Sequence, residues 1–192
     1  MKRITNRLIK MILPAVILLL PVACSVNQFV PAEGVLSEDN YAIIRSDTLL
    51  IIVRPQNYPG SYQEINSRFF PLYFKVKNTS SHKIHLNQSS FSILCNEKQY
   101  DSIPLDYVLA DLERRILLKQ FSDPFAPQVT NFGITYKEKE QEMYYELVNN
   151  AFSFGDILPG AIKEGYLFYN REIASAKRFT IDILGNTICF VK

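Results

Sequence analysis

Cys24 is the residue whose surroundings most clearly point to chemistry in this 192-residue chain. The first ten residues, MKRITNRLIK, carry four basic side chains and no acidic one, and residues 11–23, MILPAVILLLPVA, are apolar. A bilayer span needs about 20 apolar residues, and two prolines and the lack of a polar face disfavour an amphipathic core helix. A basic start, a short apolar segment and a small residue, Ala23, before the cysteine are typical of an export signal.

Residues 1–24 resemble a bacterial lipoprotein signal, in which the cysteine thiol receives a diacylglycerol, the chain is cut before it and the new N-terminus is acylated. The resemblance implies a signal peptide over residues 1–23, a lipid on Cys24 and a location in the bacterial cell envelope. Ser25 is similar to the residue after the cysteine in lipoproteins that Gram-negative cells pass to the outer membrane. The alternative is an ordinary cleaved signal beside an incidental cysteine. Residues 24–40 lack periodicity, and we expect them to form a lipidated tether.

The other two thiols, Cys95 and Cys189, would meet oxidising conditions outside the cytoplasm, where a disulfide between them could form. Cys95 shares a strand face with the apolar Phe91 and Ile93, whereas the alternation around Cys189 allows it to face the other way. Two separate buried thiols are therefore the alternative that the strand pattern favours, because a free cysteine commonly packs as a small apolar side chain.

Four further side chains are of types that catalysis or metal binding uses, but their arrangement does not suit either. His82 and His85 would point to opposite faces of a strand, so we expect no shared metal site. Ser80 and Lys83 have the spacing of some serine acylases, which place the pair at a helix start, whereas here it falls in a turn. Because no phosphate-cradling glycine loop is visible either, we expect no catalytic residue, no cofactor and no enzymatic activity.

The charge balance argues against a nucleic-acid partner. The chain has 21 Lys and Arg residues against 19 Asp and Glu residues. Four of the basic residues lie in the predicted signal, so the remainder is slightly acidic, whereas nucleic-acid binding requires a concentrated basic face. The remaining length suits one domain with a sizeable core, which we place at residues 41–192.

Most of this domain has the pattern of short strands. The segment FFPLYFKVKN places Phe70, Leu72, Phe74 and Val76 on one face and more polar residues, including Tyr73, on the other. RFTIDIL alternates in the same way, and we expect Phe74 and Ile181 to be buried on facing sheets. TLLIIV, residues 48–53, is a continuous apolar run expected of a central strand that ends at Pro55. Further strands are expected at residues 82–86, 90–95, 100–103, 165–170 and 187–191, with a turn at 96–99, which predicts an antiparallel sandwich or barrel.

The apolar period changes from two to that of a helix between these groups of strands. Residues 104–120 are predicted to form an amphipathic helix with the stripe Leu105, Val108, Leu109, Leu112, Ile116 and Leu117. A weaker helix is predicted at residues 138–152, where Met143, Leu147 and Val148 share a stripe, and residues 121–136 are expected to be an ordered loop. Residues 103–154 are thus expected to be an α-rich insertion in the β domain.

Two long segments of the body carry a family resemblance. LYFKVKNTSSHKIHLNQSSFSILCNEKQYDSI and ILPGAIKEGYLFYNREIASAKRFTIDI are similar to small bacterial lipoproteins of unknown function with an immunoglobulin-like, telokin-like β-sandwich. In these a strand ends in Asn-Thr, and a Pro-Gly turn precedes a strand that begins with glycine. The resemblance, over about residues 45–103 and 155–184, implies a mainly β fold: an immunoglobulin-like antiparallel β-sandwich with an α-helical insertion. It transfers no active site.

Two function classes remain. The first is a non-enzymatic envelope lipoprotein that is held at the membrane by its lipid and serves as an interaction or assembly module for another envelope protein. The second is a module that binds a glycan or small molecule; lack of Trp disfavours it, but Tyr144, Tyr145, Tyr166 and Tyr169 exposed on one face would favour it. We expect a partner to be recognised through residues 103–154. The alternative is that the helices only cap an open end of the sandwich.

Overall fold

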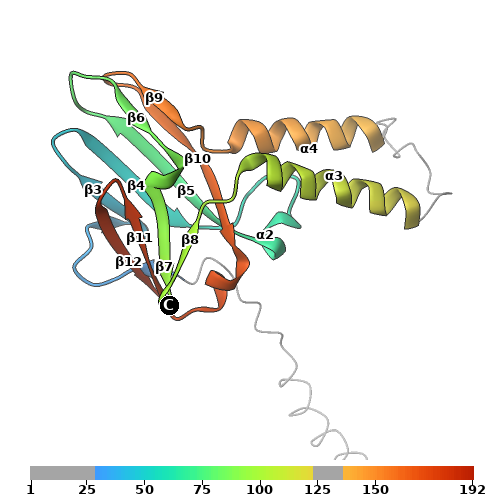
Figure 1. The fold of residues 1–192 in the computed structure, drawn as a ribbon, viewed down its shortest axis with the longest axis horizontal. Helices are drawn as coiled ribbons and strands as arrows, with labels where there is room; N and C mark the ends of the chain where they lie inside the picture. Colours follow the sequence, from blue (N-terminus) through green and yellow to red (C-terminus); the bar gives the residue numbers. More distant parts are fainter. Residues whose placement is uncertain (1–28, 123–135) are drawn as a thin grey trace, which may run out of the picture.

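The computed structural model of the chain describes residues 29–122 and 136–192 (Figure 1). Two five-stranded sheets with antiparallel pairing form a sandwich. The first sheet has the order β1 (Val30–Pro31), β12 (Asn186–Val191), β11 (Arg178–Ile183), β7 (Phe91–Cys95) and β8 (Lys98–Asp101). The second has the order β10 (Ile162–Asn170), β5 (Phe69–Asn78), β4 (Leu49–Pro55), β3 (Tyr41–Arg45) and β2 (Ser37–Glu38).

Smaller elements join these sheets. Strands β6 (Ile84–Leu86) and β9 (Gly155–Ile157) pair with each other as a separate two-stranded sheet. The described helices are the short α2 (Ile65–Arg68) and the longer α3 (Leu105–Ser122) and α4 (Tyr136–Asn150), with 3₁₀ turns η3 (Gln88–Ser90) and η4 (Arg171–Ser175). The two long helices stand between β8 and β9 in the chain, so the predicted mainly β sandwich with a helical insertion is confirmed. The finer likeness to immunoglobulin-like, telokin-like domains stays a prediction.

Strand β5 has the alternation that its sequence predicts. Phe70, Leu72, Phe74 and Val76 are all completely buried, whereas the residues between them face outward and are partly or fully exposed from Tyr73 onward. Successive side chains of a strand point to opposite faces, so one face of β5 enters the sandwich and the other does not. Phe74 and Ile181 are buried on the two facing sheets, as expected.

The apolar run of β4 is buried on one face only. β4 is a central strand, paired with β3 and β5, but only Leu49, Ile51 and Val53 face the core, while the alternate residues are half-buried on the outer face. The strand ends at Pro55, as expected. The continuous apolar pattern therefore predicted the position of the strand in the sheet and not its exposure.

Residues 165–169 of strand β10 are buried on both faces. Leu167 and Tyr169 belong to the sandwich core, whereas Tyr166 and Phe168 belong to a second apolar cluster beneath the helices. The strand begins at Ile162, so Gly165, which we expected to initiate it, lies inside it. Two different cores on its two sides explain why the sequence YLFY has no polar alternation.

The expected tether is shorter than predicted. Phe29 is only 1% exposed and packs edge-on against Phe70 and Phe179, with ring centroids 5.7 and 4.9 Å away. Val30–Pro31 then pairs with the end of β12 as strand β1, and β2 follows at residues 37–38. The predicted tether, residues 24–40, is thus wrong from Phe29 onward, because a single aromatic side chain in a polar segment reaches the core. Residues 24–28 and the predicted signal peptide lie outside the described residues.

The β7–β8 turn is tighter than expected. Asn96 and Glu97 both have positive φ, 50° and 64°, and Lys98 already begins β8, so the turn has two residues rather than four. Positive φ at both central positions matches the twist of the flanking strands in a two-residue hairpin.

Replacing Phe74 with Asp should unfold the domain. The change buries a carboxylate without a partner among aromatic rings, which costs several kcal/mol against a total stability of about 5–15 kcal/mol. Lys77→Asp, on the same strand but exposed, is the matched control and should keep a native circular dichroism spectrum and a melting temperature close to that of the original chain. Equal loss of stability in both variants would contradict the facing of β5.

Candidate functional site

The helices α3 and α4 form a hairpin that extends sideways from the sandwich (Figure 1). They contact each other along the hairpin, and only their sandwich-proximal parts reach the sheets. An 18-residue α-helix is about 27 Å long, so much of α3 lies beyond the edge of the sheet.

The base of the hairpin covers the outer face of β10. Val108, Leu109 and Leu112 of α3 and Leu147 of α4 are buried in one cluster with Tyr166 and Phe168 of the strand. The segment before β5 completes this cluster with three buried side chains that the sequence analysis did not single out, Tyr58, Tyr62 and Ile65. The hairpin therefore packs on a sheet face and does not cap an open end of the sandwich.

Both ends of the insertion are bonded to β10. The backbone N–H of Ile103 donates to the carbonyl of Phe168 at 2.7 Å, and that of Phe152 donates to the carbonyl of Tyr166 at 2.9 Å. Phe152 and Phe154 then enter the sandwich core, where Phe152 packs against Phe74 and Phe91. The ends of the predicted insertion 103–154 are consequently part of the β domain.

Ion pairs and hydrogen bonds brace the two helices against α2 and the residues just before it. Asp111 of α3 accepts from Arg68 at 2.5 Å and lies 3.4 Å from Arg115, which in turn donates to Glu64 at 2.5 Å. Asp111 also accepts from the Tyr62 hydroxyl at 3.3 Å, and burial together with this carboxylate raises the pKa of Tyr62. On α4, a carboxylate oxygen of Glu146 accepts from the backbone N–H of Ser61 at 2.8 Å.

Beyond this base the apolar stripe of α3 continues into solvent. Leu117 is 52% exposed and Leu118 is 56% exposed, although Leu117 was predicted on the same stripe as the buried Leu109. Val148 of α4 is also 38% exposed, whereas Leu147, predicted on the same stripe, is completely buried. The sheet is too short to cover the full length of the α3 stripe.

An open groove of about 620 Å³ runs between these parts of α3 and α4. We call it the hairpin groove, and its lining consists of Leu112, Glu113, Ile116, Leu117, Glu140, Gln141, Tyr144 and Tyr145. Tyr145, 55% exposed, receives a hydrogen bond at 3.3 Å from Gln141 and packs edge-on against Tyr144. The groove thus has an apolar and aromatic lining, and its charged members are both glutamates.

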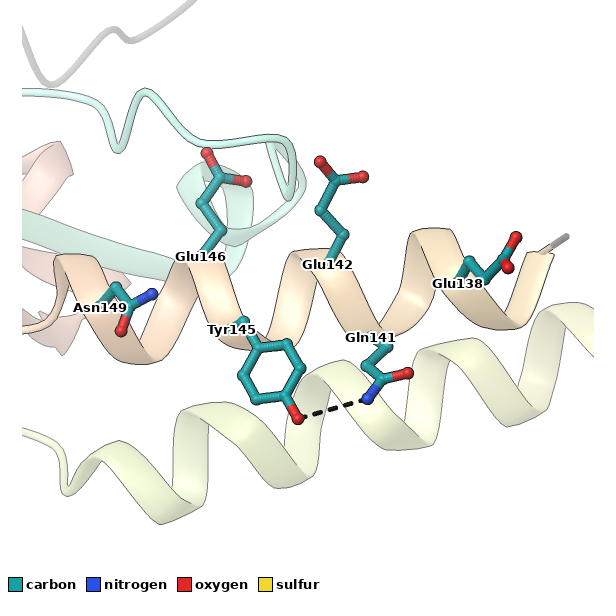
Figure 2. Close-up of a pocket in the computed structure, with 6 residues that line it drawn as sticks. All are labelled: Glu138, Gln141, Glu142, Tyr145, Glu146 and Asn149. Carbon is teal, nitrogen blue, oxygen red and sulfur yellow. Dashed lines mark hydrogen bonds between the residues drawn. The ribbon is translucent and has the colours of Figure 1, made fainter. Parts of the chain in front are cut away.

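A second depression, of about 440 Å³, lies along the neighbouring face of α4 (Figure 2). Glu138, Glu142 and Glu146 line it at a spacing of four residues, which places them on one side of a helix. Figure 2 shows Glu142 and Glu146 on one side of α4, while Tyr145 and Gln141 turn toward α3. The two depressions share Tyr145 and Gln141, and every charged residue that lines either of them is acidic.

The predicted cysteine sites are separate. Cys24 lies outside the described residues. Cys95 and Cys189 are both free thiols. Cys95 faces the core, where burial raises the pKa of its thiol. Cys189 lies in a cross-strand row with Thr180 and with Leu94, which is 55% exposed. The two thiols are on opposite faces of the sheet with β11 between their strands, so the structure does not contain the disulfide considered from the sequence.

The histidine and serine residues take part in local polar contacts. The His85 ring nitrogen Nδ1 lies 2.6 Å and the Lys83 amine 2.7 Å from Asp156, and these two partners lower the pKa of that carboxyl group, Lys83 contributing most. The single proton of the Ser80 hydroxyl has two acceptors within reach, Asn78 Oδ1 at 2.8 Å and the carbonyl of His82 at 2.9 Å. Within residues 29–122 and 136–192, no group of three His, Cys, Asp or Glu side chains is arranged to hold a metal ion.

The four tyrosines of the alternative hypothesis do not share an exposed face. Tyr144 and Tyr145 are exposed on α4, but Tyr166 is 6% exposed and Tyr169 is completely buried in the sandwich, with its hydroxyl donating to the carbonyl of Phe91 at 3.3 Å. Sequence periodicity could not show that Tyr166 and Tyr169 are buried, because a strand that is buried on both faces has no polar alternation.

Comparison with models of protein families gives no match, and comparison with curated proteins gives none either. Among solved structures, the chain matches the crystal structure of a candidate lipoprotein, YcdA, from Bacillus subtilis subsp. subtilis strain 168. The match has a TM-score of 0.38 and 11% sequence identity, and it covers 78% of this chain and 38% of the other. At this level of similarity we base no conclusion on it. Among the described helices, none has the length and apolar character to cross a membrane.

Replacing Gly165 with Ala should weaken the junction between hairpin and sandwich. Gly165 has φ of 154°, and a Cβ atom there would lie 2.6 Å from the backbone nitrogen of Phe152. Gly185→Ala is the control, since its φ is also positive, at 79°, but its Cβ would meet no atom within 4 Å. We expect a loss of about 1–2 kcal/mol for Gly185→Ala and of about 3 kcal/mol or more for Gly165→Ala, measured by denaturant unfolding. An equal loss of stability in the two variants would show that the close approach of Phe152 to Gly165 does not require a glycine.

Proposed function

We propose that the chain is a lipid-anchored, non-enzymatic protein of the bacterial cell envelope that binds another protein through the hairpin groove. The observation that carries the proposal is the exposure of Leu117 and Tyr145, each more than half exposed, on a hairpin that is fixed to the sandwich at its base. An exposed apolar surface that lies away from the core of its own domain is typical of a site that contacts another molecule.

The position of the groove supports a docking role. Its two helices are braced from both sides, by the ion pairs of Asp111 and Arg115 on α3 and by the Ser61–Glu146 hydrogen bond on α4. A surface that is already ordered loses little conformational entropy when a partner binds. Binding and recognition residues are commonly carried by insertions on a rigid scaffold in this way.

The charges around the groove favour a particular partner. Glu113 and Glu140 line the groove itself, and Glu142 lies in the adjoining depression. The complementary surface is a protein segment with apolar side chains for the groove and Lys or Arg residues beside them. Nucleic acid and anionic lipid would be repelled by the same glutamates.

Replacing Leu117 with Glu should abolish this binding. The change puts a charge into the centre of the apolar lining at a position that is half exposed, so the domain should remain folded. Leu158→Glu is the matched control, because Leu158 is 62% exposed but lies in the β9–β10 turn, away from the hairpin. Site-specific photocrosslinking from Gln141 in living cells, with mass spectrometry of the products, measures the result.

The expected outcome is one crosslinked envelope protein, joined through a segment that contains basic and apolar residues, with a yield at least tenfold lower for Leu117→Glu and unchanged for Leu158→Glu. Glu142→Lys should lower the yield as well. An unchanged yield in the Leu117→Glu variant would exclude the groove. Crosslinks to glycan rather than protein would instead favour the ligand-binding alternative.

The anchor rests on the sequence alone, and it is tested separately. Cys24→Ala should leave an uncleaved precursor that incorporates no labelled fatty acid, because no other residue can offer a thiol at that place. Cys189→Ala controls for modification of the half-buried thiol and should be processed and labelled as the original chain is. Acyl labelling of the Cys24→Ala chain would show that the lipid is not on Cys24.

A further inference from the structure

The N-terminal end of the described chain leaves the domain at one defined end of the sandwich. Phe29 is held between Phe70 and Phe179, and the Lys192 amine lies over its ring at 4.9 Å. Val30 pairs with Val191, so Phe29 lies beside the C-terminus. In Figure 1 the C-terminus marks this end, at the bottom of the sandwich, while the hairpin projects to the right.

The chain between Cys24 and Phe29 is very short. Five residue steps span at most about 18 Å even when fully extended. A lipid on Cys24 would therefore hold this end of the sandwich within that distance of the membrane surface, because the side chain of Phe29 is completely enclosed. The long tether expected from residues 24–40 would have imposed no such limit.

Basic side chains gather at the same end. Lys177, Arg178 and Lys192 are exposed there, where η4 leads into β11 and where β12 ends. The Lys192 amine also donates to the carbonyl of Ala174 at 2.6 Å, which holds this charge at the same end of the sandwich. The backbone N–H of Lys192 donates to the carbonyl of Lys177 at 3.0 Å, which keeps these two residues adjacent. Of the acidic residues on these elements and on the neighbouring β7–β8 turn, Glu172 is paired with Lys98 at 3.2 Å, and Glu97 is exposed. Asp182 lies toward the other end of β11, opposite Thr187.

We infer that Lys177, Arg178 and Lys192 form a surface that lies against anionic phospholipid headgroups, so that the short link from Cys24 fixes the orientation of the domain as well as its location. This inference rests on the proposed lipid at Cys24. Each basic side chain close to an anionic bilayer strengthens membrane association by about fivefold. The glutamates that line the two depressions of the hairpin are repelled by the same lipids, so the opposite charges of the two regions favour a single orientation.

Reductive methylation of lysines in the lipidated mature protein tests this orientation. The protein is reconstituted in vesicles of phosphatidylcholine alone or of phosphatidylcholine with phosphatidylglycerol. The rate of methylation of each lysine is then measured by mass spectrometry. Lys192 is the reporter, and Lys83, beside β6 at the opposite end of β5, is the internal reference. We compare the original chain with Lys177→Glu/Arg178→Glu and with the matched control Arg45→Glu/Lys77→Glu, which makes the same change in charge at the far end of the second sheet.

The expected result is that phosphatidylglycerol slows methylation of Lys192 about fivefold relative to Lys83 in the original chain and in the Arg45→Glu/Lys77→Glu variant. The Lys177→Glu/Arg178→Glu variant should lose this protection, and so should the original chain in 1 M salt, where charge interactions are screened within about 3 Å. Equal rates in both kinds of vesicle, or equal protection in both variants, would overturn the orientation while leaving the anchor intact. A Cys24 peptide without acyl mass would overturn the anchor and this inference together.

Discussion

The close approach of the Ala151–Phe152 backbone to Gly165 is the contact on which the arrangement of the two parts of the molecule depends. Only a residue without a side chain allows the end of α4 to come within hydrogen-bonding distance of the middle of β10. Once that bond forms, Phe152 is directed into the sandwich core and Leu147, five residues earlier, toward the outer face of the sheet. Strand β10 therefore lies between two hydrophobic cores, one on each of its faces.

The sandwich could be predicted from sequence because its strands have a period of two and its turns have recognisable residues. β5 and β11 are clear examples, since both have an inner face of Phe, Ile, Leu or Val and an outer face with polar residues. The same reasoning failed at Phe29, where a two-residue strand is too short to show any period. Its burial depends on Phe70 and Phe179, which are 41 and 150 residues away, and this is tertiary information.

The candidate site was predicted in outline only. Helical periodicity located α3 and α4, but it could not show where the sheet ends, and that boundary determines why Leu109 is buried and Leu117 exposed. The brace from α2 was missed altogether. Its ion pairs join residues such as Glu64 and Arg115, 51 positions apart, and neither residue stands in a pattern that indicates a partner. Opposite charges at such a separation are common in any sequence and identify a contact only when the fold is known.

The two bonds that tie the insertion to β10 also bear on how such a protein can change over evolutionary time. Because the chain leaves beside Phe168 and returns beside Tyr166, the ends of the insertion are close together in space, and the entropic cost of closing a longer or shorter loop between them grows only slowly with length. Related proteins could therefore differ in the length and the surface residues of the hairpin without any change in strand register. The residues that bind a partner could then change without loss of folding. The residues around Gly165 are the exception, because they hold the hairpin in place and also belong to the folded sandwich.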